Sequence, residues 1–293
     1  AVERPLPALE PALAPELRRH AGAWALLRRE RPPGVLEEEH AEGSGPLRIQ
    51  TPGGLFAEVR LPGRGGLEHA SCGGRHVLQE EGGRVFGVCE RVVSFQPPLG
   101  EHVRRRARFD EDQGTLGEVA LPLRRGDLGM EAWARVADGG AAFAAMELHS
   151  RGEQPRRAGY WLFAGRHFVR VVGLARGEGL VAGTYCRSLA DLERLCGERR
   201  VRAELEEHYD AVQGVVERPG LLRVQLRSSG AAASGAALGE AEAVLYDAAA
   251  GRGGSVSLED GWVTHCLPCG RKDRWRVVEW GFDPFTPGGA AGP

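Results

Sequence analysis

The sequence is almost without lysine. Lys272 is the only lysine, Ile49 is the only isoleucine and asparagine is absent, whereas arginine, alanine and glycine abound. This bias is typical of a very GC-rich genome, so most arginines stand in for lysines and carry little functional information. Lysine and arginine together number 38 against 40 aspartate and glutamate residues, a formal charge of -2. Long-range attraction to nucleic acid or to an anionic membrane is therefore not expected.

Cysteines and long apolar runs are also scarce. Six cysteines in 293 residues, at positions 72, 89, 186, 196, 266 and 269, are too few for a disulfide scaffold and fit a reducing compartment. No run of about 18 apolar residues occurs, so we expect a soluble protein without a transmembrane segment. The chain begins at Ala1 without methionine. This start favours removal of a transit peptide and an organelle, chloroplast or mitochondrion, with the cytoplasm as the alternative.

The sequence contains no recognisable catalytic motif. It has neither G-x-S-x-G nor H-E-x-x-H, the patterns that present a nucleophile or a catalytic zinc. His167 could meet Glu147 and His149 from an earlier strand inside a barrel. A packed or hydrogen-bonded strand histidine is the favoured interpretation, because barrel interiors routinely satisfy one imidazole. We expect no catalytic residues and a protein that is not an enzyme.

What the chain does have is short alternating segments. Apolar and polar residues alternate over 47–50 and 55–61 around a turn in which Pro52 fixes φ and Gly53 and Gly54 accept positive φ, which predicts a β-hairpin. Similar runs separated by Gly and Pro predict further strands at 24–28, 85–95, 103–109, 115–121, 130–136, 142–149, 159–164, 166–172, 221–227, 243–246, 262–267 and 275–282. This spacing favours an antiparallel barrel or sandwich. One short helix is expected from Ser188 to Leu195, covering a barrel end, with Ser188 as its N-cap.

Two Gly-x-Trp triplets divide the chain. Gly22 and Trp24 precede the first run of strands, and Gly159 and Trp161 open a second run, which indicates a duplicated barrel. The predicted organisation is an N-terminal arm (1–18), a first barrel (19–140), a second barrel (141–285) and a C-terminal tail (286–293). The low-complexity segment from Ser228 is predicted to be a loop insertion.

His265, Cys266 and Cys269 form the sharpest local chemical pattern. A Cys-x-x-Cys spacing suits tetrahedral zinc, and His265 could add a nitrogen ligand. A structural zinc needs a second pair, for which only Cys186 and Cys196 remain. A redox dithiol is a further alternative. Ordinary cysteines in a strand and a turn are favoured, and no metal is expected.

Residues 177–182 match the relaxed dinucleotide-binding pattern G-x-G-x-x-A. Such binding needs a parallel sheet and a helix that starts at the glycines. The preceding segments predict an antiparallel hairpin and the helix begins later, so a glycine-rich loop is favoured.

The tryptophans offer two interpretations. Barrel core is the favoured one, because aromatic rings bury a large area and fill a barrel end. The alternative is an apolar pocket for a lipid, tetrapyrrole or carotenoid in the barrel mouth. The six residues are Trp24, Trp133, Trp161, Trp262, Trp275 and Trp280.

A collinear series of motifs resembles the fungal Hrr-interacting protein family and its uncharacterised bacterial relatives. The series comprises Gly22-x-Trp24, the hairpin 47–62, the segment 89–97, the segment 131–135 and the segment 165–168. The resemblance implies an all-β fold of two lipocalin-like antiparallel β-barrels packed together, with no established enzymatic activity. It also implies that Gly22 and Trp24 close one barrel end, and we extend this role to Gly159 and Trp161.

Some segments depart from the family pattern. Cys266 and Cys269 replace apolar, Thr or Ser residues, and the arm 1–18, the insertion 228–240 and the tail 286–293 look particular to this protein. We expect partner subunits to bind there. The expected function is a non-catalytic scaffold or accessory subunit of a larger protein assembly. The alternative is a carrier for a hydrophobic ligand or pigment, and an isomerase or pigment lyase using Cys or His ranks last.

Overall fold

The computed structural model describes residues 14–31, 35–39, 45–60, 71–81, 84–94, 103–110, 115–120, 130–138, 143–150, 155–175, 178–180, 189–218, 221–229, 255–266 and 272–281. Most of these residues lie in strands. The helices are α1 (Ala14–Arg19), α2 (Leu189–Cys196) and α3 (Glu198–His208). Within the described ranges, no helix is both long enough and apolar enough to cross a membrane.

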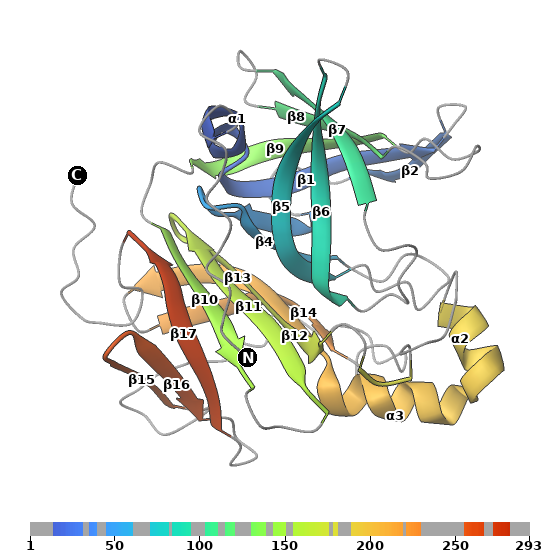
Figure 1. The fold of residues 1–293 in the computed structure, drawn as a ribbon, viewed down its shortest axis with the longest axis vertical. Coiled ribbons are helices and arrows are strands. Elements are labelled where there is room, and N and C mark those ends of the chain that lie inside the picture. The colour runs from blue at the N-terminus through green and yellow to red at the C-terminus, as the bar shows by residue number, and fades with distance from the viewer. Residues whose placement is uncertain are drawn as a thin grey trace.

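The first sheet closes into a barrel. It is nine-stranded and antiparallel in the order β2-β1-β3-β4-β5-β6-β7-β8-β9, and β9 also pairs with β1, which closes the sheet. This barrel forms the upper half of the molecule in Figure 1. Closure leaves β1 and β9 with no exposed edge along their shared length. The strands are β1 (Gly22–Arg31), β2 (Val35–Glu39), β3 (Leu47–Gln50), β4 (Leu55–Val59), β5 (Cys72–Glu81), β6 (Arg84–Ser94), β7 (Val103–Asp110), β8 (Thr115–Ala120) and β9 (Met130–Asp138).

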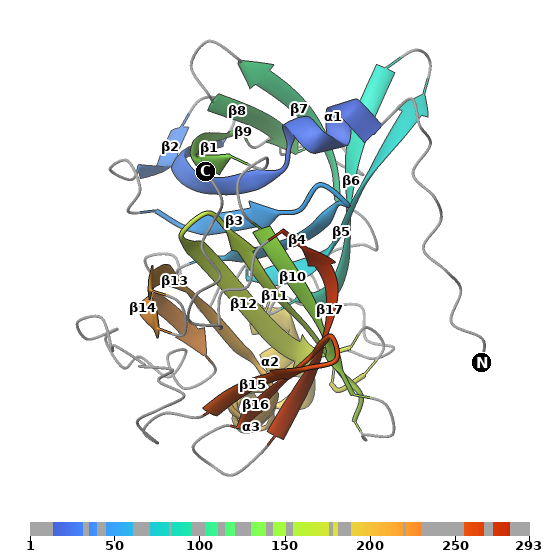
Figure 2. The same ribbon diagram turned by 90° about the vertical axis from the view of Figure 1, so that its left-hand side faces the viewer.

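The second sheet is curled and lies below the first barrel. Its eight antiparallel strands follow the order β14-β13-β12-β11-β10-β17-β16-β15. Figure 2 shows it wrapping into a half-barrel beneath β3 and β4. The predicted all-β fold of two packed, barrel-like antiparallel sheets is therefore confirmed. The strands are β10 (Phe143–His149), β11 (Arg157–Ala164), β12 (His167–Leu174), β13 (Asp210–Arg218), β14 (Leu221–Ser229), β15 (Ser255–Glu259), β16 (Trp262–Cys266) and β17 (Lys272–Trp280).

The helices and segment boundaries differ in part from the sequence-based expectation. Helix α2 matches the predicted 188–195 helix, but α3 was not predicted. Its N-cap is Gly197. Glycine has no side chain that could accept a capping hydrogen bond, so the Ser, Thr or Asp that usually marks the start of a helix is missing. The arm does not extend to residue 18, because residues 14–18 belong to α1 and Leu17 is completely buried. The insertion does not begin at Ser228, since β14 continues to Ser229. Residues 1–13, 230–240, 243–246 and 286–293 lie outside the described part.

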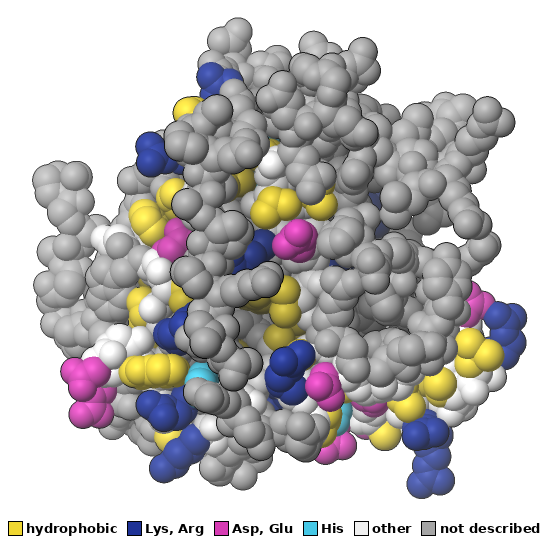
Figure 3. Space-filling model, viewed as in Figure 1, with side chains coloured by type: hydrophobic (Ala, Val, Ile, Leu, Met, Phe, Trp, Pro, Cys, Tyr) yellow, Lys and Arg dark blue, Asp and Glu magenta, His cyan; other side chains and the backbone are white. Residues whose placement is uncertain are grey.

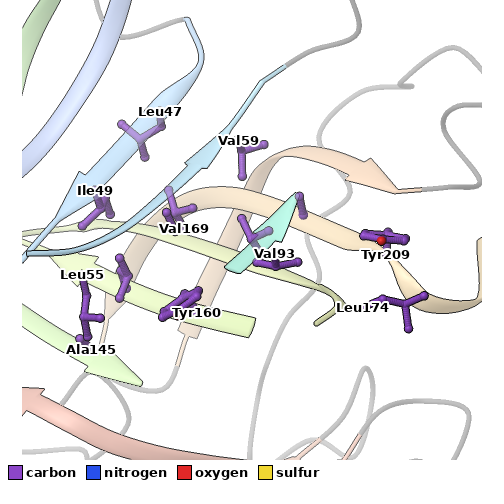
Figure 4. Packing of buried hydrophobic residues seen from close by; sticks show 14 of the residues in the cluster. Leu47, Ile49, Leu55, Val59, Val93, Ala145, Tyr160, Val169, Leu174 and Tyr209 are labelled. Carbon is purple, nitrogen blue, oxygen red and sulfur yellow. The ribbon is translucent and has the colours of Figure 1, made fainter. Parts of the chain in front are cut away.

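A shared apolar core joins the two sheets. Alternate residues of β3 and β4 point towards β11 and β12. Tyr160 of β11 belongs to the same apolar cluster, as Figure 4 shows. Burial, reinforced by Glu147, raises the pKa of Tyr160, so its phenol stays protonated. Residues of α2 and α3 belong to the same cluster, so these helices cover part of the core between the sheets. The cluster includes Leu47, Ile49, Leu55, Ala57, Val59, Val93, Ala145, Leu162, Val169, Val171, Leu192, Val201, Leu205 and Tyr209.

Polar contacts fasten the sheets at two further places. Gln213 of β13 accepts a hydrogen bond from Leu47 N at 2.8 Å and donates one to Gly45 O at 3.2 Å. Glu279 of β17 accepts hydrogen bonds from Thr51 Oγ1 at 2.6 Å and from Gly53 N at 3.1 Å. The predicted 51–54 turn is thus also a contact between the two halves of the molecule.

Candidate functional site

The interior of the first barrel is lined by polar side chains. Strands β3 and β4 are buried on both faces. The residues that alternate with the shared core, Arg48 and Gln50 on β3 and Phe56 and Glu58 on β4, point into the barrel and are 1–2% exposed. Alternation by itself predicts a solvated polar face here. Only barrel closure turns that face into an interior.

One polar network surrounds Arg48. Its Nη2 donates to Gln50 Oε1 at 3.4 Å and to Cys89 Sγ at 3.8 Å. The guanidinium lies 5.4 Å from the centroid of the Phe56 ring. His76 Nδ1 is 2.9 Å from Gln50 Oε1, so the histidine donates to the amide oxygen. A buried cation is thus held by an amide, a thiol and an aromatic ring.

Helix α1 covers this network. Leu17 O accepts a hydrogen bond from Gln50 Nε2 at 3.4 Å, and His20 O accepts one from Trp24 Nε1 at 2.9 Å. The rings of His20 and His76 meet edge to face, with centroids 5.2 Å apart. The helix therefore closes one end of the first barrel.

A second network of the first barrel is a charge-balanced quartet. Glu131 Oε1 accepts from Arg29 Nη2 at 2.9 Å and from Arg60 Nη1 at 2.8 Å, and Oε2 accepts from Arg60 Nη2 at 2.9 Å. Arg60 also pairs with Glu58 and lies 5.4 Å from the centroid of the Trp133 ring. Two arginines and two glutamates leave no net charge. Within the described part of the chain, the buried Nε1 of Trp133 has no hydrogen-bond partner.

In the second sheet, Arg170 joins an acid and a histidine. Its Nη2 donates to Asp210 Oδ2 at 2.6 Å, and its Nη1 lies 3.2 Å from His265 Nδ1. A guanidinium only donates, so Nδ1 of His265 accepts, and the imidazole is the neutral tautomer with its proton on Nε2. Arg170 also stacks 5.7 Å from the centroid of the Trp161 ring.

A second ion pair and a pair of indoles complete this interior. Arg157 Nη2 donates to Asp273 Oδ1 at 2.9 Å, and both side chains are buried. Trp161 and Trp275 meet with ring centroids 5.6 Å apart, and both are completely buried. The Nε1 of Trp275 has no hydrogen-bond partner among the described residues.

These interiors are arranged for packing and charge pairing. The large rings fill the space, and the carboxylates of Glu58, Glu131, Asp210 and Asp273 each pair with an arginine. Hydrogen-bonded pairing of this kind is what makes buried charge tolerable. Among the residues that the structure describes, no group of three or more His, Cys, Asp or Glu side chains is placed to hold a metal ion.

The two Gly-x-Trp triplets do not occupy equivalent strands. Gly22 opens β1 with a φ of 129°, which favours glycine, and Trp24 is 1% exposed, with Arg135 4.5 Å above its ring. Gly159 and Trp161 lie within β11, the second strand of its sheet in chain order. Both indoles are buried, but the triplets do not mark a duplicated first strand.

The structure separates the zinc candidates. His265 is completely buried and faces the sheet interior, whereas Cys266, the next residue of β16, faces the other side. Adjacent residues of a strand point to opposite faces, so these two side chains cannot ligate one ion. Cys269 and Cys186 lie outside the described residues.

The acid and base candidates are separated as well. Glu147 and His149 share one face of β10, but His167 lies opposite Ala164 and beyond Phe143, at the other end of that strand. Burial, and secondarily Arg166, lowers the pKa of His167. The structure therefore does not bring together these three residues, whose meeting inside a barrel was the less favoured interpretation.

The glycine-rich segment does not sit in a nucleotide-binding fold. Its preceding strand, β12, pairs antiparallel with both neighbours, and α2 begins only at Leu189. Of the six residues 177–182, the structure describes 178–180. A dinucleotide site needs a parallel sheet at this position, so the glycine-rich loop interpretation stands.

The outer face of β10, β17 and β16 carries a cluster that sequence reasoning missed. Arg274 lies 4.7 Å from the centroid of the Trp262 ring, and the His149 ring meets the same indole edge to face at 5.1 Å. Lys272 and Arg276 flank Arg274 on β17 and are exposed. The detectable signal was the alternation of basic residues from 272 to 276 in a strand that also carries a tryptophan.

Comparison with known proteins gives one distant structural neighbour. No protein family matches the chain, and no curated protein matches it. The crystal structure of the uncharacterised Saccharomyces cerevisiae protein YLR301w aligns with a TM-score of 0.49 at 11% sequence identity, over 88% of this chain and 98% of that one. Membership of the fungal Hrr-interacting family stays a prediction.

Proposed function

We propose that this protein is a non-catalytic scaffold or accessory subunit of a larger protein assembly. The observation that carries the proposal is the filling of both interiors: Trp24, Trp133, Trp161 and Trp275 are each at most 1% exposed. Interiors filled by rings and paired charges favour a rigid body that acts through its outside surfaces. The core shared by the two sheets adds to this rigidity.

The proposal places partner contacts on the segments that the sequence singled out. Outside α1 and β14, the sequences of the arm (1–13), the insertion (230–240) and the tail (286–293) are rich in Pro, Gly, Ala or Ser, a composition that offers little apolar surface to drive ordering. A partner subunit would supply that surface. We assign the assembly to a reducing compartment, in an organelle or in the cytoplasm.

Size measurement of the native protein tests the scaffold proposal. Light scattering after size exclusion of a native extract should find the protein in a complex larger than the 31.5 kDa monomer. Affinity purification followed by mass spectrometry should then identify stoichiometric partners. A population that is monomeric throughout would count against the proposal.

A second candidate function is a carrier for a small hydrophobic ligand such as a lipid, tetrapyrrole or carotenoid. The observation that favours it is the indole N–H of Trp133 and of Trp275, each completely buried and without an acceptor among the residues that the structure describes. A buried donor without a partner costs about 1–3 kcal/mol, which a ligand oxygen could offset. Native mass spectrometry and visible absorption of the purified protein test this candidate, and a ligand-free spectrum would remove it.

A further inference from the structure

The exposed face of β17 is basic. Lys272, Arg274 and Arg276 alternate along the strand and share its outer side, while Asp273 and Trp275 between them are buried on the inner side. Figure 3 shows dark blue side chains beside hydrophobic and histidine atoms over the region of β16 and β17. Three cations therefore line one accessible strand.

Arg274 is held in place by its neighbours. It lies opposite His149 on β10 and opposite Thr264 on β16, and its guanidinium stacks on Trp262 at 4.7 Å. The edge-to-face contact of His149 steadies the same indole. Stacking leaves the edge of a guanidinium, which carries its N–H donors, free to meet a carboxylate.

Positive charge is concentrated at one end of this face. Arg276 is paired with Glu147 at 3.2 Å. In the part of the chain that the structure describes, neither Lys272 nor Arg274 has a salt-bridge partner, and Glu259 and Asp260 are exposed at the opposite, β15–β16 end. The face is therefore positively charged at the Lys272 end and negatively charged at the Glu259 end. A bound segment can place only a few negative charges against the cations before it reaches the acidic residues.

We infer that this face binds an acidic, extended segment of a partner protein. Alternate strand residues are about 7 Å apart, so carboxylates at alternate positions of an extended segment match Lys272 and Arg274. An apolar residue of the segment would lie on Trp262. The inference rests on the proposed scaffold function and gives the chemistry of one partner contact. A long polyanion such as RNA fits less well, because it would run onto Glu147, Glu259 or Asp260.

Fluorescence polarisation with the 293-residue protein tests the inference. The probe is a labelled peptide of alternating Glu and Val, compared with a peptide of alternating Gln and Val. We expect saturable binding of the acidic probe only, weakening as salt is added. The double variant Lys272→Glu/Arg274→Glu should bind at least about tenfold more weakly, because it replaces the two cations proposed to meet the acidic segment with negative charges that repel it. Arg274→Lys should bind with intermediate affinity, since it keeps the charge and weakens the stacking.

A matched control places two charge reversals elsewhere. Arg199→Glu/Arg200→Glu, on exposed positions of α3, makes the same change in net charge and should leave binding unchanged. Unfolding midpoints of both double variants should equal that of the unaltered protein. Absent binding, equal loss in both double variants, or tighter binding of poly(U) RNA or of anionic vesicles would overturn the inference. If the Lys272→Glu/Arg274→Glu protein still enters its native complex, the scaffold proposal stands and this contact falls. If the unaltered protein binds the peptide but enters no complex, the scaffold proposal falls.

Discussion

The two halves of the molecule fill their interiors differently. Among the described residues of the first barrel, the interior apolar side chains form two separate clusters of three, with polar networks beside them. Among the described residues of the second sheet, eleven buried apolar side chains form one continuous cluster. The ion pairs Arg157–Asp273 and Arg170–Asp210 complete that interior. The comparison shows that two halves of one all-β fold can be stabilised differently: hydrogen-bonded ion pairs contribute more to the interior of the first barrel, and packing of apolar side chains contributes more to that of the second sheet.

We expect different kinds of substitution to destabilise the two interiors. A continuous apolar cluster loses stability when volume is removed, because the surrounding side chains only partly fill the cavity. A buried charge network loses stability when one member is neutralised, because the remaining charges stay buried and lose a partner. Variants of single residues can therefore separate the two cases.

The largest effect is expected for Trp161→Ala. This indole touches the rings of Phe163, His265 and Trp275, so its removal should cost about 3–5 kcal/mol of unfolding free energy. Trp24→Ala, in a cluster of three, should lie at the lower end of the same range. Urea unfolding monitored by circular dichroism measures both. An equal loss in the two variants would contradict the difference between the interiors.

Neutralising Glu131 tests the charged interior. Its carboxylate serves both Arg29 and Arg60, so Glu131→Gln should cost about 3 kcal/mol. The control Glu147→Gln breaks more exposed pairs with Arg75 and Arg276 and should cost less than about 1 kcal/mol. Urea titrations of the two variants decide the matter. Similar costs would mean that burial does not strengthen the Glu131 network.

A smaller effect should follow from loosening the contact between the halves. Glu279→Ala removes the acceptor of Thr51 and Gly53, and we expect a cost of about 1–2 kcal/mol. Glu207→Ala, which removes an exposed carboxylate from α3, is the matched control. Hydrogen exchange should show faster opening around residues 51–55 in Glu279→Ala alone. Unchanged exchange would mean that the shared apolar core is sufficient.

The smallest effect concerns pH. Burial lowers the folded-state pKa of His167 below its ordinary value of about 6.5, so the unfolded chain binds the proton more readily. The folded state then loses stability as pH falls through about 6.5 and keeps it above that pH. His167→Gln should therefore lose less stability than the unaltered protein between about pH 7 and pH 5. Melting temperatures across this interval measure the difference, and parallel curves would refute the assignment.

Much of the fold was predictable because strands and turns are encoded locally. The alternation over 47–50 and 55–61 predicted the hairpin and its turn correctly, and the helix expected from Ser188 to Leu195 matches α2 to within one residue at each end. Helix α3 was missed because it lacks a side-chain cap. The depth at which α1 is buried was missed because Leu17 finds its contacts only in the folded barrel.

Candidate sites were less predictable, because side chains far apart in sequence must meet. The pattern His265-Cys266-x-x-Cys269 suggested shared ligands, yet the pleat of β16 sends the first two to opposite faces. Arg170 and His265 gave no joint signal, and the second sheet places them 3.2 Å apart. The basic face around Arg274 was visible as alternation, but its stacking on Trp262 requires β16 to lie beside β17.

The sequence by itself determined the class of this protein, because its alternating segments separated by Gly and Pro predict antiparallel β-structure. Only the tertiary structure decided which polar residues face water and which face a barrel interior. Arg48 and Glu58 alternate with apolar neighbours as solvated residues do, and both are nevertheless 2% exposed. The physical reason is that alternation fixes only the side of a strand on which a residue lies. Closure of the sheet through β1 and β9, a contact distant in sequence, decides what that side meets.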